Sequence, residues 1–208
     1  MDKTIKYIVR FLLGVEDNET SDIDKLVGYT DDEREFTNYK VVVYPSSFFE
    51  EGVYGTKASR PRKPFDYIDT TPILFGSKKI EKHKDTLVVY ADIIAASYYY
   101  LSRYEEATRI KKRDKHGRFP AKKSVAYKAG FLNRPVVDEY GRLLRTWLRE
   151  VGVAINEPAE EIQKIYLTHD VLNPFFNRSW KSMMREISQG RFFMQAIKER
   201  MKPLAQDK

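Results

Sequence analysis

The chain has 208 residues, of which 42% are hydrophobic and 13% aromatic, so it can bury a core of domain size and is not a disordered tail. It contains no cysteine, which excludes disulfides and thiolate metal sites. No run approaches the roughly 20 apolar residues that a membrane span requires. Lys6 and Arg10 interrupt the apolar start, so we do not expect it to be a signal peptide. We therefore expect a cytoplasmic protein without a membrane partner.

The net charge of +7 is unevenly distributed along the chain. Residues 103–128 carry ten Lys or Arg against three Asp or Glu, and residues 178–208 carry eight against three. Residues 16–36 carry nine acids against two bases. A basic face could attract a phosphate backbone or an acidic polysaccharide. The alternative is a solvated charged surface that balances the acidic segment.

In the first half of the chain, apolar periodicity predicts a helix over residues 4–13, which Gly14 ends. Residues 20–36 indicate an acidic loop. Residues 50–69 are rich in Gly, Pro and charge, which predicts a long loop. Apolar runs without polar alternation predict short strands that are covered on both faces, at residues 40–45, 71–76 and 86–92.

Two helices are predicted in the middle of the chain. The first covers residues 92–110, with Asp92 at its start, and a basic loop follows it. The second covers residues 134–152, with Pro135 in its first turn and Gly152 at its end. This alternation of helices and strands predicts an α/β fold.

The run Tyr98–Tyr100 lies on the first of these helices and could stack on sugars or bases. Consecutive residues point in different directions on a helix, so at most two of the three rings could share a cleft. Packing in the core is the alternative for the others.

A domain boundary is expected near residue 157, in the turn-like stretch "NEPAEE". After it, residues 164–171 predict a strand that ends in His169 and Asp170. An apolar helix is expected from about Ser179 onward, and it requires a partner surface. A carboxylate at the end of a strand can act as a general base on a metal-bound water. Alternatively, Asp170 caps the turn that follows the strand.

A second candidate site lies in the charged segment of residues 102–120. Arginine offers forked donors, histidine a switchable donor, and aspartate accepts hydrogen bonds from sugar hydroxyls. The candidates for binding an anionic or hydroxyl-rich ligand are Arg103, Glu106, Asp114, His116 and Arg118. In the alternative interpretation, the arginines and carboxylates pair with one another and fix the loop.

Four ordered blocks of sequence carry a family resemblance. They are "SRYEE" (102–106), "D-x-HGRF" (114–119), "KAGFLNRPVVDEY" (128–140) and "THDV" (168–171). With these blocks, residues 1–175 resemble the N-terminal domain of unknown function and the first catalytic strand of bacterial polysaccharide-deacetylase-like proteins. The resemblance implies a small α/β domain over residues 1–157. It also implies the first strand and helix of an incomplete (β/α) barrel over residues 158–208.

The resemblance also implies which catalytic features this chain keeps. Catalytic domains of the family remove acetyl groups from carbohydrates with a divalent metal, and Asp170 matches the general base. Leu172 stands where the family has a metal-binding aspartate, and an aliphatic side chain cannot bind a metal. No histidine follows Asp170 and no two histidines are four residues apart. We therefore expect Asp170 to be a vestigial base, with no metal site and no cofactor; a divalent metal is expected only in a complete family member.

These observations favour a non-catalytic accessory or interaction module that docks on a catalytic barrel or binds carbohydrate. Its expected partners are the remainder of a deacetylase barrel or a second copy of the chain through residues 179–201. One alternative is a metal-dependent carbohydrate deacetylase that uses Asp170. Another is a nucleic-acid-binding domain that uses residues 103–128, although no recognised nucleic-acid-binding fingerprint is present.

Overall fold

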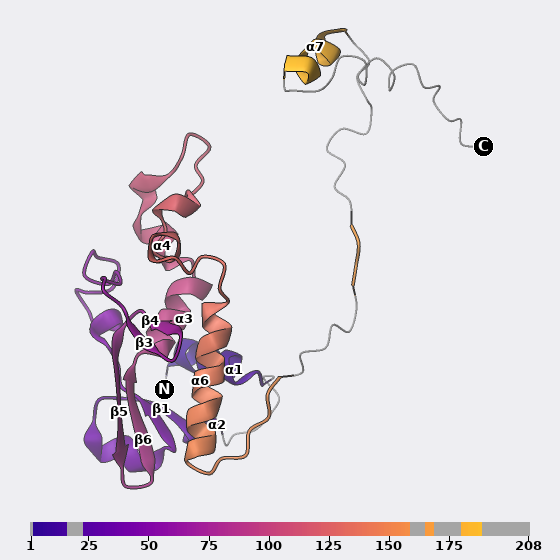
Figure 1. Cartoon of the computed structure of the whole chain (residues 1–208). Coiled ribbons are helices and arrows are strands. Elements are labelled where there is room, and N and C mark those ends of the chain that lie inside the picture. The colour runs from indigo at the N-terminus through magenta and orange to yellow at the C-terminus, as the bar shows by residue number, and fades with distance from the viewer. Residues whose placement is uncertain (1, 16–22, 159–164, 169–179, 189–208) are drawn as a thin grey trace. The chain divides into compact units, whose positions relative to one another are not determined.

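The computed structural model describes residues 2–15, 23–158, 165–168 and 180–188. The chain divides into two compact units, Met1–Glu160 and Glu161–Lys208. The first unit contains both sheets and the helices that cover the larger sheet (Figure 1). In the second unit, the described secondary structure is the helix α7, Trp180–Ser188, on which Met184 is exposed.

A four-stranded sheet in the order β1-β2-β6-β5 forms the centre of the first unit. The first three of these strands run parallel, and β5 pairs with β6 in the antiparallel direction. Their bounds are β1 Val27–Tyr29, β2 Val41–Val43, β5 Gly76–His83 and β6 Thr86–Ala91. A separate antiparallel pair is formed by β3 Asp66–Ile68 and β4 Thr71–Ile73.

The central strands are covered on both faces. Val41 and Val43 belong to the main core, whereas Val42 packs with Phe36 and Val88 in a smaller cluster on the opposite face. This explains why β2 is a run of valines without a polar position, because each side chain meets apolar neighbours. The strands predicted at 40–45, 71–76 and 86–92 are confirmed, with shorter bounds.

Three helices pack together beside the sheet (Figure 1). They are α1 Lys3–Leu13, α3 Ile93–Leu101 and α6 Val136–Glu150. Gly14 ends α1 in the left-handed conformation at φ 72°, as its position predicts. Gly141 lets α6 approach α1 closely, since a β-carbon there would lie 2.6 Å from the carbonyl oxygen of Leu12.

Shorter elements complete the first unit. They are the helical turns α2 Ile23–Leu26, η1 Glu33–Asn38, η2 Ser47–Phe49, α4 Tyr104–Thr108, η3 Ile110–Lys112, η4 Ala121–Lys123 and α5 Val125–Ala129. Within the part of the chain that the structure describes, no helix is long and apolar enough to cross a membrane.

The structure corrects two of the predicted elements and adds a strand. The longest strand, β5, was not predicted, because its sequence "GSKKIEKH" is charged and its side chains are largely exposed. It forms by backbone pairing with β6 at the edge of the sheet, where little burial is needed. The predicted acidic loop contains β1. The predicted helix over residues 92–110 breaks at Arg103, whose φ of 54° is left-handed and ends a regular helix.

The strand predicted at residues 164–171 is not found in the four of its residues that the structure describes. Residues 165–168 form no strand and are exposed, with Leu167 at 90%. A strand needs a partner for its backbone groups, and no described strand pairs with this stretch. His169, Asp170 and Leu172 lie outside the described residues, as do residues 189–208. The mixed α/β class is confirmed for the described chain.

Candidate functional site

An open groove of about 580 Å³ lies between the start of α1, the loop after η2 and the helix α3. We call it the aromatic groove. Its apolar wall consists of Phe49, Tyr54 and Tyr98. Its acidic residues are Asp2, Glu50 and Glu51, and its lining is completed by Thr4, Ile5 and Gly52. The groove therefore combines aromatic rings with carboxylates that can accept hydrogen bonds.

The three rings of the wall are held in contact with one another. The centroids of Phe49 and Tyr98 lie 5.2 Å apart with the rings nearly perpendicular, and Phe49 and Tyr54 are nearly parallel at 6.4 Å. The hydroxyl oxygens of Tyr54 and Tyr98 are 2.5 Å apart, within hydrogen-bonding distance. The buried ring of Phe48 contacts all three from behind. This packing fixes the wall in advance of any ligand.

The loop that carries Tyr54 is anchored to α4. Its backbone turns through hydrogen bonds from the amides of Val53 and Tyr54 to the carbonyl of Glu50, at 3.1 and 3.0 Å. The amide of Gly55 donates to the hydroxyl of Tyr104 at 2.5 Å. Gly55 adopts a φ of 80°, which glycine permits without strain. Tyr104 therefore positions one wall of the groove from a distant part of the sequence.

The polar groups of the groove are suited to hydroxyl-rich ligands at neutral pH. The hydrogen bond with Tyr98 raises the pKa of Tyr54 to about 12, so the Tyr54 phenol stays protonated at neutral pH. The two tyrosine hydroxyls share one hydrogen bond, so the O–H of one of them can still donate to a ligand. The carboxylates of Glu50 and Glu51 are exposed and can accept. The hydrogen bond from the Thr4 amide lowers the pKa of Asp2, which keeps this helix-capping carboxylate ionised.

The tyrosine run of α3 is divided among three environments. Tyr98 lines the aromatic groove, while Tyr99 is 1% exposed and belongs to the core. Tyr100 lines a separate, mainly apolar pocket of about 320 Å³ beside Phe131 and Leu132. One of the three tyrosines thus reaches the groove, in keeping with the different directions of consecutive helical residues.

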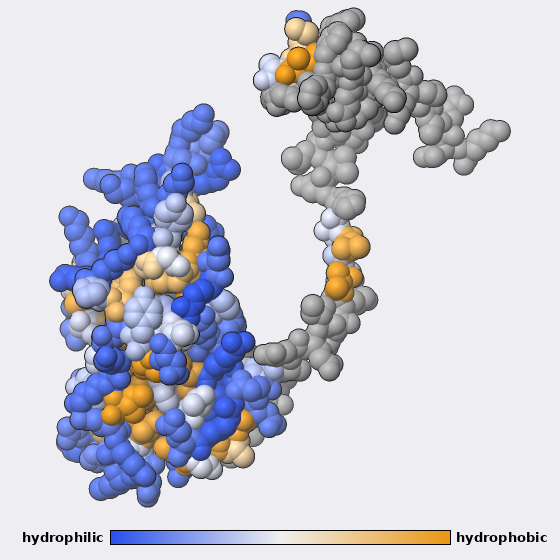
Figure 2. Space-filling model, in the orientation of Figure 1, coloured by the Kyte–Doolittle hydropathy of each residue, from blue (hydrophilic) through white to orange (hydrophobic). Residues whose placement is uncertain are grey.

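Residues 103–128, which we call the basic lobe, hold the other predicted ligand-binding residues. Figure 2 shows the surface of this part of the molecule as mostly hydrophilic. Arg103 donates to both carboxylate oxygens of Glu106, at 3.0 and 2.6 Å. Arg103 is exposed, so water screens this pair and it contributes little to stability.

Asp114, His116 and Arg118 are brought together in one turn of the basic lobe. The carboxylate of Asp114 accepts from the amides of His116 and Arg118, at 2.8 and 2.9 Å. These bonds lower the pKa of Asp114. The guanidinium of Arg118 lies 3.5 Å from the same carboxylate, and the His116 residue is exposed. The five predicted residues thus form two separate local sets.

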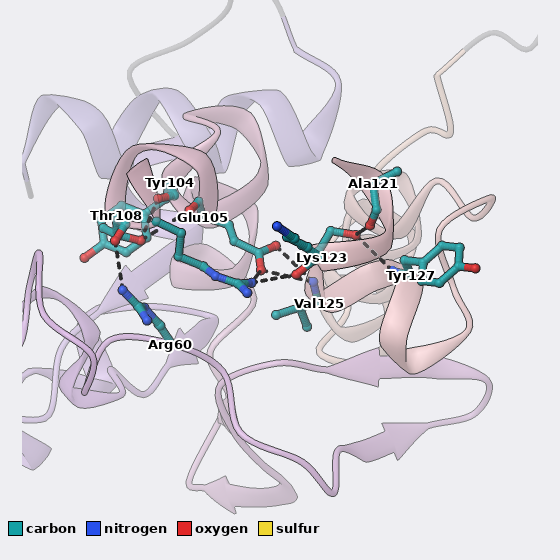
Figure 3. A network of polar contacts seen from close by, with 10 residues as sticks. Arg60, Tyr104, Glu105, Thr108, Ala121, Lys123, Val125 and Tyr127 are labelled. Atoms are coloured by element: carbon teal, nitrogen blue, oxygen red, sulfur yellow. Dashed lines mark hydrogen bonds and ion pairs between the residues drawn. The ribbon is translucent and has the colours of Figure 1, made fainter. Parts of the chain in front are cut away.

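A buried carboxylate, Glu105, holds the basic lobe together (Figure 3). Both of its oxygens accept from the amide of Val125, at 3.1 and 3.0 Å, and one pairs with Arg109. Arg109 also donates to the carbonyl of Lys123 at 2.7 Å. Arg60 donates to the carbonyl of Thr108 at 2.8 Å. Together these contacts join α4 to the far end of the basic loop.

A second buried carboxylate lies where the three parallel strands end. Asp92 caps α3 by accepting from the amide of Ala95 at 2.9 Å. It also accepts from the hydroxyl of Tyr29 at 2.9 Å and from the amide and hydroxyl of Ser46 at 2.7 and 2.6 Å. Burial raises the pKa of Asp92, and these hydrogen bonds partly offset the effect. Its acceptor sites are used within the chain, so we assign it a structural role.

Within the described residues, no three His, Asp or Glu side chains are grouped in a way that could hold a metal ion. The predicted base Asp170 is outside this part of the chain. The charged sequence around His83 predicts a solvated side chain. In the structure, His83 is half-buried at the end of β5, and its ring meets the ring of Phe36 edge-on with the centroids 5.7 Å apart.

The residues that sequence reasoning missed are those of the loop "FFEEGVYG", residues 48–55. Residues 50–55 belong to the long loop that glycine, proline and charge predict for residues 50–69. The pairing of aromatic rings with carboxylates in residues 48–55 was the available signal. This pattern indicates a binding groove only when the structure places the loop beside Tyr98.

A profile described as a family of unknown function (DUF7033) matches residues 1–152. This span includes the sheet, the three covering helices, the aromatic groove and the basic lobe. No curated protein and no solved structure matches the chain.

Proposed function

The chain belongs to DUF7033, a family of unknown function, and we propose that this domain is a non-catalytic binding module that holds a carbohydrate chain in the aromatic groove. The observation that carries the proposal is the wall of Phe49, Tyr54 and Tyr98 with Glu50 and Glu51 beside it. No catalytic step is assigned to these groups.

The chemistry of the groove supports a carbohydrate rather than a purely apolar ligand. A sugar ring has faces of C–H groups that pack on aromatic rings, and hydroxyls that donate to carboxylates. Tyrosine suits such a ligand because its ring is apolar and its hydroxyl is polar. The groove is open rather than enclosed, which fits a segment of a longer chain.

The resemblance of residues 1–175 to polysaccharide-deacetylase-like proteins supports an accessory role. In this proposal, the domain docks on a catalytic barrel and presents substrate to it, or the chain associates with a second copy through residues 179–201. On this resemblance, Leu172 stands where that family has a metal-binding aspartate. We therefore expect the chain to release no acetate from acetylated oligosaccharides.

Calorimetric titration with neutral oligosaccharides tests the proposed binding. Tyr54→Ala should weaken binding about tenfold, because it removes a stacking surface worth roughly 1 kcal/mol or more. Tyr127→Ala is the matched control, since Tyr127 is 47% exposed against 45% for Tyr54 and lies outside the groove. The absence of binding to any oligosaccharide, or an equal loss in both variants, would contradict the proposal.

A second candidate function is binding of nucleic acid by the basic lobe. Lys111, Lys112, Lys115, Lys122 and Lys123 are exposed on it. In the described part of the chain none of these lysines forms an ion pair. Such a surface predicts affinity that falls steeply with salt. An unchanged mobility of DNA and RNA at low ionic strength would dispose of this candidate.

A further inference from the structure

The described side chains that line the aromatic groove carry negative charge and no positive charge. Glu50 and Glu51 are consecutive and exposed, and Asp2 lines the groove with them. The residues that line the groove include no lysine or arginine. Among the described residues, neither Glu50 nor Glu51 takes part in an ion pair. Glu50 and Glu51 therefore present negative charge beside three aromatic rings, and no lysine or arginine that lines the groove offsets it.

We propose that the aromatic groove selects carbohydrate chains that carry protonated amines over neutral or acidic ones. This inference rests on the proposed carbohydrate-binding function and specifies the ligand class. The ligand is an oligomer of amino sugars whose amines are not acetylated.

The negative charge of Glu50 and Glu51 decides the preference for amine-bearing sugars, because it has the opposite sign to the net charge of the chain. The net charge is +7, so a cationic ligand is repelled by the protein as a whole and is attracted only where acids gather. The same carboxylates repel sugars that carry carboxylate or sulfate groups. Selectivity therefore arises from attraction to one ligand class and repulsion of another.

The amine also matches the groups that the groove offers. A protonated amine has three hydrogen-bond donors and a full charge, and it forms charge-assisted bonds with the carboxylates of Glu50 and Glu51. It can also lie over the face of Tyr54 in a cation–π contact. An acetylated amine keeps one donor and loses the charge. A bare metal ion would leave the aromatic wall unused.

The test compares two oligomers of equal length, of glucosamine and of N-acetylglucosamine, titrated into the full chain in mildly acidic buffer. Both the sugar amines and the carboxylates are then charged. We expect the amine form to bind about tenfold more tightly at low salt, with the difference shrinking as salt screens the exposed charges. The double variant Glu50→Gln/Glu51→Gln should remove most of the difference, because it weakens binding of the amine oligomer more than binding of the acetylated oligomer.

The double variant Glu33→Gln/Glu35→Gln is the control, because it makes the same charge change at exposed residues of η1 outside the groove. It should preserve the preference. Equal affinity for the two oligomers would overturn the inference and leave the carbohydrate proposal standing. Binding of neither oligomer would overturn both. Oligolysine of matched charge binding as tightly as the amine oligomer would also overturn the inference.

Discussion

At the scale of single residues, the two buried carboxylates show how side chains hold distant segments together. Asp92 joins β1, the segment after β2, and the start of α3 through four hydrogen bonds. Each bond replaces water that the buried carboxylate has lost. The residue follows an apolar strand and precedes a helix, so the sequence indicates its capping role. The bonds from Tyr29 and Ser46 depend on strand order, which the sequence does not show.

Replacing Asp92 with asparagine should destabilise the protein by about 2 kcal/mol, because an amide nitrogen would face donors and leave them unsatisfied. Chemical denaturation measures the loss. Asp85→Asn, in the exposed turn between β5 and β6, should stay within roughly 0.5 kcal/mol of the parent. A loss at Asp92 no larger than this control would contradict the assigned role.

The pH dependence of stability tests the same residue independently. Burial raises the pKa of Asp92 above its usual value of 3.8, so the folded protein retains a proton that the unfolded chain releases. The contribution of this group to the free energy of unfolding therefore falls as the pH rises from about 3.8 through the folded-state pKa. Asp92→Asn should lack this fall, whereas parallel pH profiles would contradict it.

At the scale of elements, α1 and α6 approach closely because Gly141 has no side chain. A β-carbon there would lie 2.6 Å from the carbonyl oxygen of Leu12. That oxygen already accepts from the buried guanidinium of Arg145 at 2.6 Å. The amphipathic pattern of each helix follows from the sequence, but their pairing requires the tertiary structure.

Gly141→Ala should therefore destabilise the protein by about 2 kcal/mol, since overpacking outweighs the helix propensity gained by alanine. Thr146→Ala, at an exposed position of the same helix, is the control and should change stability little. Thermal unfolding of both variants checks the prediction. A more stable Gly141→Ala variant would show that the helices can separate at little cost.

The folded conformation of the basic lobe depends on the contacts of Glu105 with Arg109 and Val125. Glu105→Gln removes the charge that pairs with Arg109 and weakens the contact with the Val125 amide. We expect a loss of about 3 kcal/mol and faster hydrogen exchange at Val125. Glu106→Gln affects only the pair with exposed Arg103 and should change stability little. Equal exchange rates at Val125 in the two variants would contradict this account.

At the scale of the whole molecule, the described core lies within Met1–Glu160. A fragment of residues 1–160 should therefore unfold cooperatively at nearly the temperature of the full chain. Calorimetry measures the two temperatures, and a fragment without a cooperative transition would contradict the expectation.

The apolar C-terminal segment leads to a separate expectation about assembly. The full chain should self-associate through residues 179–201, because the apolar residues of this segment need a covering surface and Met184 of α7 is exposed. The fragment of residues 1–160 should stay monomeric. Sedimentation velocity at several concentrations distinguishes the two, and a monomeric full chain at high concentration would count against the prediction.

The sequence by itself determined the elements whose signals are local. The valine run of β2, the Asp92 cap and the Gly14 stop are each specified by a few neighbouring residues, and the α/β class follows from their alternation. Tertiary structure decided the rest. The charged strand β5 forms because β6 offers a backbone edge, and Arg103 breaks a helix that local periodicity would continue. The groove joins α1, residues 49–54 and Tyr98, and contacts between such distant residues leave no periodic pattern in the sequence.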